Sequence, residues 1–178
     1  HCSNPQKRKH VDGQLNITDH MEQLKQELLK STASLVQDQY GNYVIQHVLE
    51  HGKQEDKCQI VRNLKGHIFE LSKHKFASNV IEKCVQYGGG EERQLILEEI
   101  VGLSGNYDKK GTASGTALEA MMKDQYANYV IQKILDVCDN NQRDLLITHI
   151  KPHVVTLKKF TYGKHIIARL EKLIGRSL

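Results

Sequence analysis

The chain has 178 residues, of which 39% are hydrophobic and 26% are charged, an ordinary composition for a soluble globular domain with a sizeable core. It contains no stretch of about 18 apolar residues and no basic-then-apolar leader, so neither a membrane span nor a secretory signal is predicted. The net charge of +4 is compatible with an anionic partner, although many soluble proteins carry such a charge.

Four cysteines are present: Cys2, Cys58, Cys84 and Cys138. They form no C-x-x-C pair, and no paired histidines complete a zinc site, so no metal site and no cofactor are predicted. Reduced thiols in a cytosolic compartment, and hence a cytoplasmic protein, are expected. The chain begins at His1 rather than at a methionine, which suggests a segment of a longer protein.

The first predicted element is a helix over residues 19–30, "DHMEQLKQELLK". Before it, "HC" at 1–2 matches "HG" at 51–52 and is interpreted as the tail of a preceding helix. The interval from Cys2 to Tyr40 exceeds that from Gly52 to Phe76 by 14 residues, which predicts an inserted loop over roughly 5–18. Its "KRKH" could contact phosphate, but a solvated loop is the preferred interpretation.

The next element carries a motif that returns later: "DQYGNYVIQ" at 38–46 and "DQYANYVIQ" at 124–132 differ at a single position. The aromatic residue of the motif recurs at Tyr40, Phe76, Tyr126 and Tyr162, at intervals of 36, 50 and 36 residues. A fixed period of this length is typical of repeat proteins. The longer middle interval is attributed to a surface loop at 103–116, "LSGNYDKKGTASGT", which lacks apolar periodicity and is rich in glycine.

Helical segments recur in register at 55–66, 91–102 and 141–152, each with apolar residues at helical spacing. Each unit is therefore predicted to hold a helix, a short connecting segment such as 67–74, and a second helix that starts near the aromatic residue. Units of this kind stack into a solenoid. The predicted division of this single solenoid domain is 1–18 for the tail and inserted loop, 19–52, 53–88 and 89–138 for three repeats, and 139–178 for a C-terminal capping repeat.

The second helix of each unit has an apolar side that should face the core. In the last unit this side ends in Glu171, which fits a capping unit with a solvated outer side. Cys84 lies on the apolar side of the second unit and is interpreted as a small core hydrophobe rather than a catalytic thiol. The residues of this side are Val44, Ile45, Val48 and Leu49, then Val80, Ile81, Cys84 and Val85, then Val130, Ile131, Ile134 and Leu135, then Ile166, Ile167, Leu170 and Glu171.

The opposite side of the same helix carries three polar residues per unit, which are predicted to face solvent. Asparagine is a poor helix former, so its return needs a reason. Two amides one turn apart can hydrogen-bond a base edge while a flat side chain stacks on the ring, and a carboxylate can accept two N–H groups of guanine. The alternative is a polar surface with tyrosines that pack across repeats. The three positions hold Asn42, Tyr43 and Gln46, then Ser78, Asn79 and Glu82, then Asn128, Tyr129 and Gln132, then Lys164, His165 and Ala168.

The motifs "DQYGNYVIQHVLEHG", "HKFASNVIEKC", "MMKDQYANYVIQK" and "FTYGKHIIARLEKL" resemble the repeats of Pumilio-type (PUF) RNA-binding proteins. The resemblance covers residues 1–2 and 19–178, and these look like the last three repeats and the C-terminal cap of a domain that normally has eight repeats. It implies three helices per repeat, one base read per repeat on the concave face, and an RNA strand antiparallel to the protein.

Carried over residue by residue, the resemblance implies the ligand 5′-UGU-3′, the core of elements in messenger 3′ untranslated regions. Uracil would be read by the asparagine–glutamine pairs and guanine by the serine–glutamate pair, with one stacking residue in each unit. The implied base-edge residues are Asn128 and Gln132, Ser78 and Glu82, and Asn42 and Gln46, and the implied stacking residues are Tyr129, Asn79 and Tyr43.

A basic or histidine side chain follows each base-edge position, namely His47, Lys83, Lys133 and Arg169. These residues could give the groove a positive flank for phosphates, although lysine and arginine are also common on solvent-exposed helices. In the last unit, Lys164 could approach a phosphate and His165 could stack on a base, or both could simply cover the last helix.

No catalytic triad or paired carboxylates stand out, so no enzyme is predicted. The sequence therefore predicts an all-α, right-handed α-solenoid that binds single-stranded RNA in post-transcriptional regulation. The family resemblance suggests translation-repression or deadenylation proteins as further partners. The alternative function is a helical-repeat scaffold for protein partners, and a third expectation is self-association through an apolar N-terminal face left without a neighbouring unit.

Overall fold

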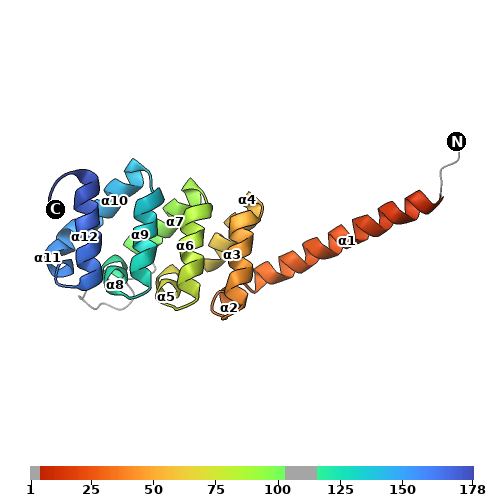
Figure 1. The fold of residues 1–178 in the computed structure, drawn as a ribbon, viewed down its shortest axis with the longest axis horizontal. Helices are drawn as coiled ribbons and strands as arrows, with labels where there is room; N and C mark the ends of the chain where they lie inside the picture. The colour runs from red at the N-terminus through yellow and green to blue at the C-terminus, as the bar shows by residue number, and fades with distance from the viewer. Residues whose placement is uncertain (1–4, 103–115) are drawn as a thin grey trace.

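The computed structural model describes residues 5–102 and 116–178, and the side chains of residues 17–102 and 116–178. Within these ranges every regular element is helical, and the helices stack into an α-solenoid, as the sequence predicts (Figure 1). The predicted tail at 1–2, the side chains of "KRKH" and most of the predicted loop at 103–116 lie outside the described residues. Of that loop, Thr116 is described, and its hydroxyl caps the helix α8 (Ala117–Lys123) by accepting a hydrogen bond from Glu119 N at 3.2 Å.

The first helix corrects one prediction. α1 (Pro5–Lys30) is continuous and projects from the rest of the molecule (Figure 1), so the loop predicted over 5–18 is wrong. That prediction came from counting residues, and a count does not determine backbone conformation. Glutamine, lysine and leucine are common in this segment and favour a helix, and proline is tolerated at the first helical position. Gly13 is about 1 kcal/mol less favourable than alanine in a helix, yet α1 continues through it.

Three successive units each contribute a short helix, a central helix and a third helix. The segment 67–74, predicted as a connection, contains one of the short helices. The first unit has α2 (Thr32–Leu35), α3 (Gly41–His51) and α4 (Gln54–Leu64), the second has α5 (Ile68–Ser72), α6 (Ala77–Tyr87) and α7 (Gly90–Val101), and the third has α8, α9 (Ala127–Val137) and α10 (Asn140–Ile150). These are followed by a 3-10 helix η1 (Lys151–His153), α11 (Val154–Leu157) and α12 (Thr161–Ile174).

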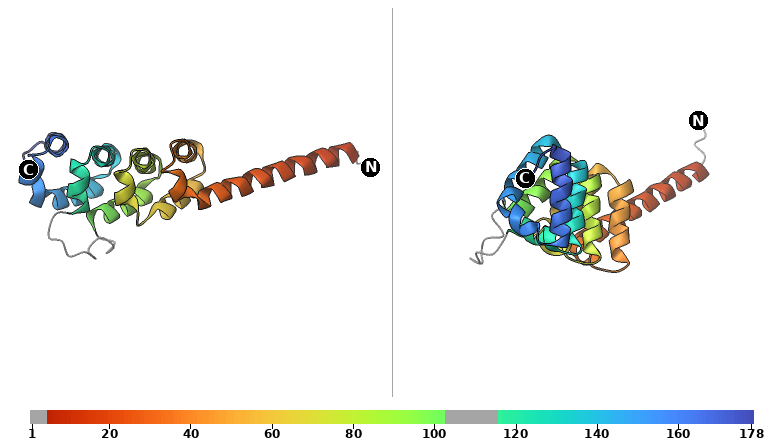
Figure 2. Two further views of the ribbon diagram at one scale, coloured as in Figure 1. Left: turned by 90° about the horizontal axis from the view of Figure 1, so that it is seen from below. Right: turned by 60° about the vertical axis from the view of Figure 1, so that its left-hand side comes forward.

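The central helices α3, α6, α9 and α12 lie side by side in one layer, and α4, α7 and α10 form a second layer behind them (Figures 1 and 2). We call the four helices of the first layer the front helices. Their predicted apolar sides form the core, and in α6 the whole predicted set from Val80 to Val85 is fully buried. Complete burial raises the pKa of the Cys84 thiol to about 12, which fits a core residue rather than a reactive thiol.

The two ends of the front layer differ from its middle. Val44 of α3 is 42% exposed, whereas the equivalent Val80 and Val130 are fully buried, because no front helix precedes α3 within the described residues. At the other end, Glu171 of α12 is partly exposed and its carboxylate pairs with Lys158 Nζ at 2.9 Å. The predicted wet outer side of the last unit is therefore occupied by an ion pair.

Polar side chains tie neighbouring units together. Gln54 Nε2 donates to the carbonyl of Gly88 (2.7 Å), across 34 residues of sequence. Glu99 is 1% exposed and accepts the backbone N–H groups of Gly66 and Ile68, the latter at 2.9 Å. Burial raises the pKa of Glu99, against the lowering effect of these two hydrogen bonds. Because such ties fix each unit on the next, they also fix the spacing of the front helices.

Candidate nucleic-acid interface

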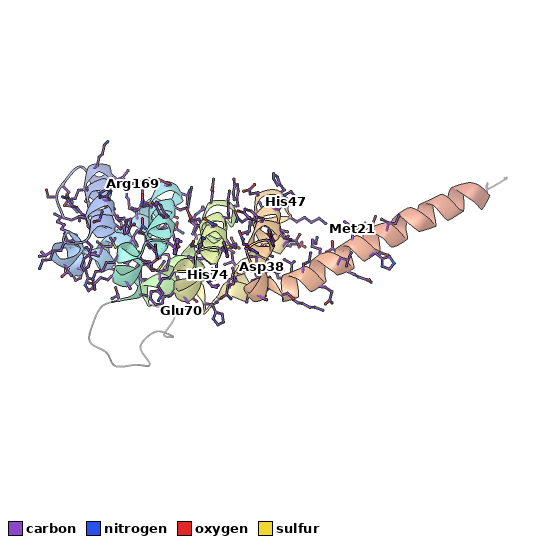
Figure 3. The ribbon with its side chains drawn as sticks, turned by 60° about the horizontal axis from the view of Figure 1, so that its bottom comes forward. Met21, Asp38, His47, Glu70, His74 and Arg169 are labelled. Atoms are coloured by element: carbon purple, nitrogen blue, oxygen red, sulfur yellow. The ribbon has the colours of Figure 1, made fainter. Side chains whose placement is uncertain are left out.

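The first three front helices each begin at a turn held by one side chain. Asp38 Oδ2 accepts the backbone N–H groups two and three residues ahead, at 2.9 and 2.7 Å, and these bonds lower the pKa of the Asp38 carboxyl. Asp124 makes the same pair of hydrogen bonds, both at 2.8 Å. In the second unit His74 Nδ1 replaces the carboxylate and accepts the equivalent N–H groups at 3.0 and 3.2 Å. Asp38 and His74 accordingly lie at the same end of their helices (Figure 3).

The two asparagines of the predicted base-edge set do not face solvent, which corrects their predicted placement. Asn42 is 1% exposed and Asn128 is fully buried. Nδ2 of Asn42 donates to the carbonyls four and three residues earlier, at 2.8 and 3.1 Å, and Nδ2 of Asn128 repeats this at 2.7 and 3.1 Å. The recurrence of asparagine therefore has a local structural reason, because its amide closes the turn that starts the helix.

Each asparagine also holds the glutamine one turn later. Gln46 Nε2 donates to Asn42 Oδ1 at 2.8 Å, and Gln132 Nε2 donates to Asn128 Oδ1 at 3.0 Å. Both glutamines are half-buried at the surface of the front layer. Since both amide protons of the asparagine are already used, only its Oδ1 and the glutamine amide remain to meet a ligand. The predicted pairing of the two amides is thus present, with the glutamine as the exposed member.

The second unit offers a carboxylate at the position of these glutamines. Ser78 is 3% exposed, and its Oγ lies 3.5 Å from the carbonyl of Lys75. Glu82 is half-buried, and this burial raises the pKa of its carboxyl, while the charges of Lys133 and Lys83 lower it. Within the described residues no hydrogen bond or ion pair satisfies the carboxylate of Glu82. It is therefore an acceptor available to a ligand.

The predicted stacking residues stand next to these groups and are exposed. Tyr43 is 67% exposed and Tyr129 is 52% exposed, and Asn79 is also exposed. In α12 the corresponding side chains, Lys164 and His165, are exposed as well. The rings of Tyr43 and Tyr129 are therefore accessible to a base that lies against the front layer.

Two of the four residues of the basic flank predicted from the sequence are neutralised by carboxylates. Lys83 Nζ lies 2.5 Å from Glu50 Oε1 on α3, and Arg169 of α12 pairs with Asp136 on α9. Arg169 Nη1 also lies 3.5 Å from Gln132 Oε1. Among the described residues no carboxylate pairs with Lys133. His47 packs against the ring of His51, with centroids 4.8 Å apart, and both His47 and Arg169 are seen in Figure 3.

The sequence analysis missed the carboxylates that hold the starts of the front helices and pair with the cations between them. Asp38 and Asp124 are the aspartates of the repeated "DQY", and an aspartate just before a helix commonly accepts the free backbone N–H groups at its start. Glu50 and Asp136 each follow a glutamine of the amide pair by four residues, one helical turn, which was also a readable signal. The burial of the asparagines had no comparable signal, because it depends on how the preceding turn packs.

Within residues 5–102 and 116–178 no helix is both long and apolar enough to cross a membrane. No cluster of three or more histidine, cysteine, aspartate or glutamate side chains is arranged to hold a metal ion in the same ranges.

Comparison with known proteins places this geometry in a family. The model of the Pumilio-family RNA binding repeat matches residues 32–65, 67–101 and 119–151, more than half of the chain. Each match begins inside a short helix or within one residue of its start, and it ends at or just past the third helix of its unit. The chain is 51% identical over 157 residues to Pumilio homolog 1 of Arabidopsis thaliana, covering 88% of this chain and 15% of that protein.

A second relative and a solved structure point to the same family. The chain is 48% identical over 153 residues to mRNA-binding protein puf3 of Schizosaccharomyces pombe, covering 86% of this chain and 20% of that protein. It superimposes on the crystal structure of PUF-8 in complex with PBE-RNA with a TM-score of 0.75 and 40% identity, covering 86% of this chain and 43% of that one. The chain thus spans a minor part of each relative. The matched repeats and their shared helical architecture show that the chain belongs to the Pumilio family of RNA-binding repeat proteins.

Proposed function

We propose that the front layer binds single-stranded RNA in a sequence-specific manner, as a step in the post-transcriptional regulation of messenger RNA. The observation that carries the proposal is the alternation along three adjacent helices. An amide pair, then an unpaired carboxylate, then a second amide pair occupy the same place on α3, α6 and α9, each beside an exposed flat side chain. A scaffold that only binds proteins has no need of that alternation.

The amide pairs suit uracil. Uracil presents one N–H donor between two carbonyl acceptors, so it can donate to the Oδ1 of Asn42 or Asn128 while accepting from the neighbouring glutamine. When the base binds, hydrogen bonds to the base replace the hydrogen bond between each glutamine and asparagine. Tyr43 and Tyr129 supply rings on which the base stacks.

The carboxylate suits guanine. An ionised Glu82 accepts hydrogen bonds and donates none, and guanine offers two adjacent N–H donors at its N1 and N2 edge. With the strand antiparallel to the protein, as in the family, α9, α6 and α3 would read 5′-UGU-3′, the core of elements in 3′ untranslated regions. Stacking contributes roughly 1–3 kcal/mol per base, so three bases give weak binding once the strand has been ordered. In this proposal the chain acts in the cytoplasm and places repressor or deadenylation proteins on a messenger.

The test compares two labelled single-stranded RNAs that differ only in UGU and UUU, at fixed moderate salt, with the natural chain and Glu82→Gln. We expect the natural chain to prefer UGU, and the variant to lose that preference because an amide cannot accept both guanine donors. Equal binding of both RNAs by the natural chain would leave an electrostatic surface without base readout. Absence of binding at high micromolar protein would refute the proposal for this chain.

A second candidate function rests on α1. Its residues Ile17, Met21, Leu24 and Leu28 are between 42% and 64% exposed and follow one another at intervals of four, three and four residues, so they form one apolar stripe. The spacing of the stripe is the same in both chain directions, so two antiparallel copies of α1 would pair Ile17 with Leu28 and Met21 with Leu24. We propose a weak homodimer through this stripe, because four side chains from each copy are far fewer than the roughly 20–30 residues a side of a standard interface. Sedimentation over a range of concentrations tests it.

A further inference from the structure

Neighbouring front helices meet along a seam that carries one cation and one carboxylate. The cation always comes from the later helix, at the residue directly after its base-edge position, and the cations are Lys83, Lys133 and Arg169. The carboxylate comes from the earlier helix. Its position on that helix is not constant, and the change of position coincides with the change of base-edge residue.

In the first and third seams the carboxylate stands one turn beyond the base-edge glutamine. Glu50 follows Gln46 by four residues and binds Lys83 Nζ at 2.5 Å. Asp136 follows Gln132 by four residues and pairs with Arg169. In both seams the base-edge side chain is a neutral amide, and the cation pairs with a carboxylate that lies outside the base-edge positions.

The middle seam, between α6 and α9, is arranged differently. Gln86 stands where Glu50 and Asp136 stand in the other seams, so that position carries no charge. The carboxylate of this seam is the base-edge residue Glu82 itself. Lys133 has no ion pair among the described residues, and its positive charge lowers the pKa of Glu82, which burial raises.

We propose that Lys133 and Gln86 are specificity-determining residues for guanine: Lys133 supplies the counter-charge that keeps Glu82 an ionised acceptor, and the neutral Gln86 leaves Lys133 free to do so. This inference rests on the proposed function of the front layer. It extends the base-reading set of the second unit beyond Ser78, Asn79 and Glu82, and it makes the neighbouring unit part of the readout.

Other charges around α6 do not replace Lys133. Lys83 on α6 also lowers the pKa of Glu82, but its ammonium is held by Glu50 of α3. The histidines His47 and His51 of α3 act on Glu50. Charged groups of α4, α5 and α7 have other partners: Lys57 lies over the ring of Tyr87, Glu70 pairs with Lys73, and Arg93 donates to the carbonyl of Val85. Lys133 is thus the cation of the described residues that faces Glu82 without a competing carboxylate.

The experiment measures the ratio of UGU to UUU affinity as a function of pH for the natural chain, Lys133→Gln, Gln86→Glu and the double variant. Guanine preference needs the ionised carboxylate, so it is present above the pKa of Glu82 and is lost as the pH falls through it. Removing or capturing the counter-charge should raise the midpoint of this loss by about half a unit to one unit. At the natural midpoint a shift of one unit lowers the preference about 5-fold.

Three controls separate this effect from others. Lys133→Arg keeps a cation at this position and should keep the natural midpoint. Asp136→Asn removes the carboxylate of the next seam, where the base-edge residue does not titrate, so this variant should keep the natural midpoint as well. In the double variant the midpoint should shift by less than the sum of the shifts in the two single variants, because no lysine remains for the new glutamate to pair with. A carboxyl NMR titration of Glu82 without RNA should show the same order of midpoints, which tests the inference even in a variant that binds RNA poorly.

The outcomes are distinct. If the natural chain shows no UGU preference at any pH, the proposed function fails and this inference falls with it. If the natural chain prefers UGU but Lys133→Gln keeps its midpoint, this inference alone is overturned. A loss of affinity in Lys133→Gln that is equal for both RNAs at every pH would assign Lys133 to phosphate contact instead, and would also overturn it.

Discussion

The buried asparagine of each amide pair should contribute to folding before any RNA is present, and Asn128→Ser isolates that contribution. Serine is the natural residue at the equivalent position 78, so the helix accommodates it. The substitution removes two hydrogen bonds from Nδ2 to backbone carbonyls, at 2.7 and 3.1 Å, in a fully buried setting. It also removes the bond that Oδ1 accepts from Gln132, but Gln132 is only half-buried and its amide can bond to water instead. At about 0.5–1.5 kcal/mol for each bond, the free energy of unfolding should fall by about 2 kcal/mol. For a chain of this size that corresponds to a melting temperature about 5 °C lower.

Urea denaturation followed by far-UV circular dichroism measures this loss in the absence of RNA. Asn79→Ser is the matched control, because Asn79 is exposed and its amide lies at the limiting distance of 3.5 Å from Lys75 O. The control should change the free energy of unfolding by less than about 0.5 kcal/mol. If Asn128→Ser unfolds at the same urea concentration as the natural chain, the asparagine has no structural role and the reasoning about the turn is refuted.

Three further predictions concern the caps, the stacking residues and α1. Asp38→Ala should lower the melting temperature at neutral pH. Because the pKa of Asp38 in the folded state lies below the usual 3.8, the difference in melting temperature between the variant and the natural chain should shrink as the pH falls through the folded-state pKa. An equal difference at acidic pH would contradict this prediction. Tyr129→Ala should weaken binding of UGU and UUU RNA equally, by about 1–3 kcal/mol in a fluorescence titration, whereas a change confined to one RNA would exclude a pure stacking role. Leu24→Glu should abolish any concentration dependence of the sedimentation coefficient, and a dimer that persists in this variant would place the contact elsewhere than the stripe of α1.

The sequence by itself determined the architecture and the polarity of the front helices. The 36-residue period and the helical spacing of apolar residues are written into the chain, and they require stacked helices whose apolar sides meet. The same spacing places Val80, Ile81, Cys84 and Val85 on one side of α6, the side that the neighbouring helices bury. The unusual residues on the opposite side of these helices could be found because they recur at one position.

Tertiary structure decided how those residues are used. Asn42 is buried because the turn before α3 brings its own carbonyls to the amide, and no periodicity describes that turn. Lys83 and Arg169 are neutralised by carboxylates from the preceding unit, and Lys133 is not, which depends on the register between helices far apart in sequence. Val44 has the same residue type and helical position as Val130 and yet remains exposed, because burial depends on a neighbouring helix and not on the residue itself.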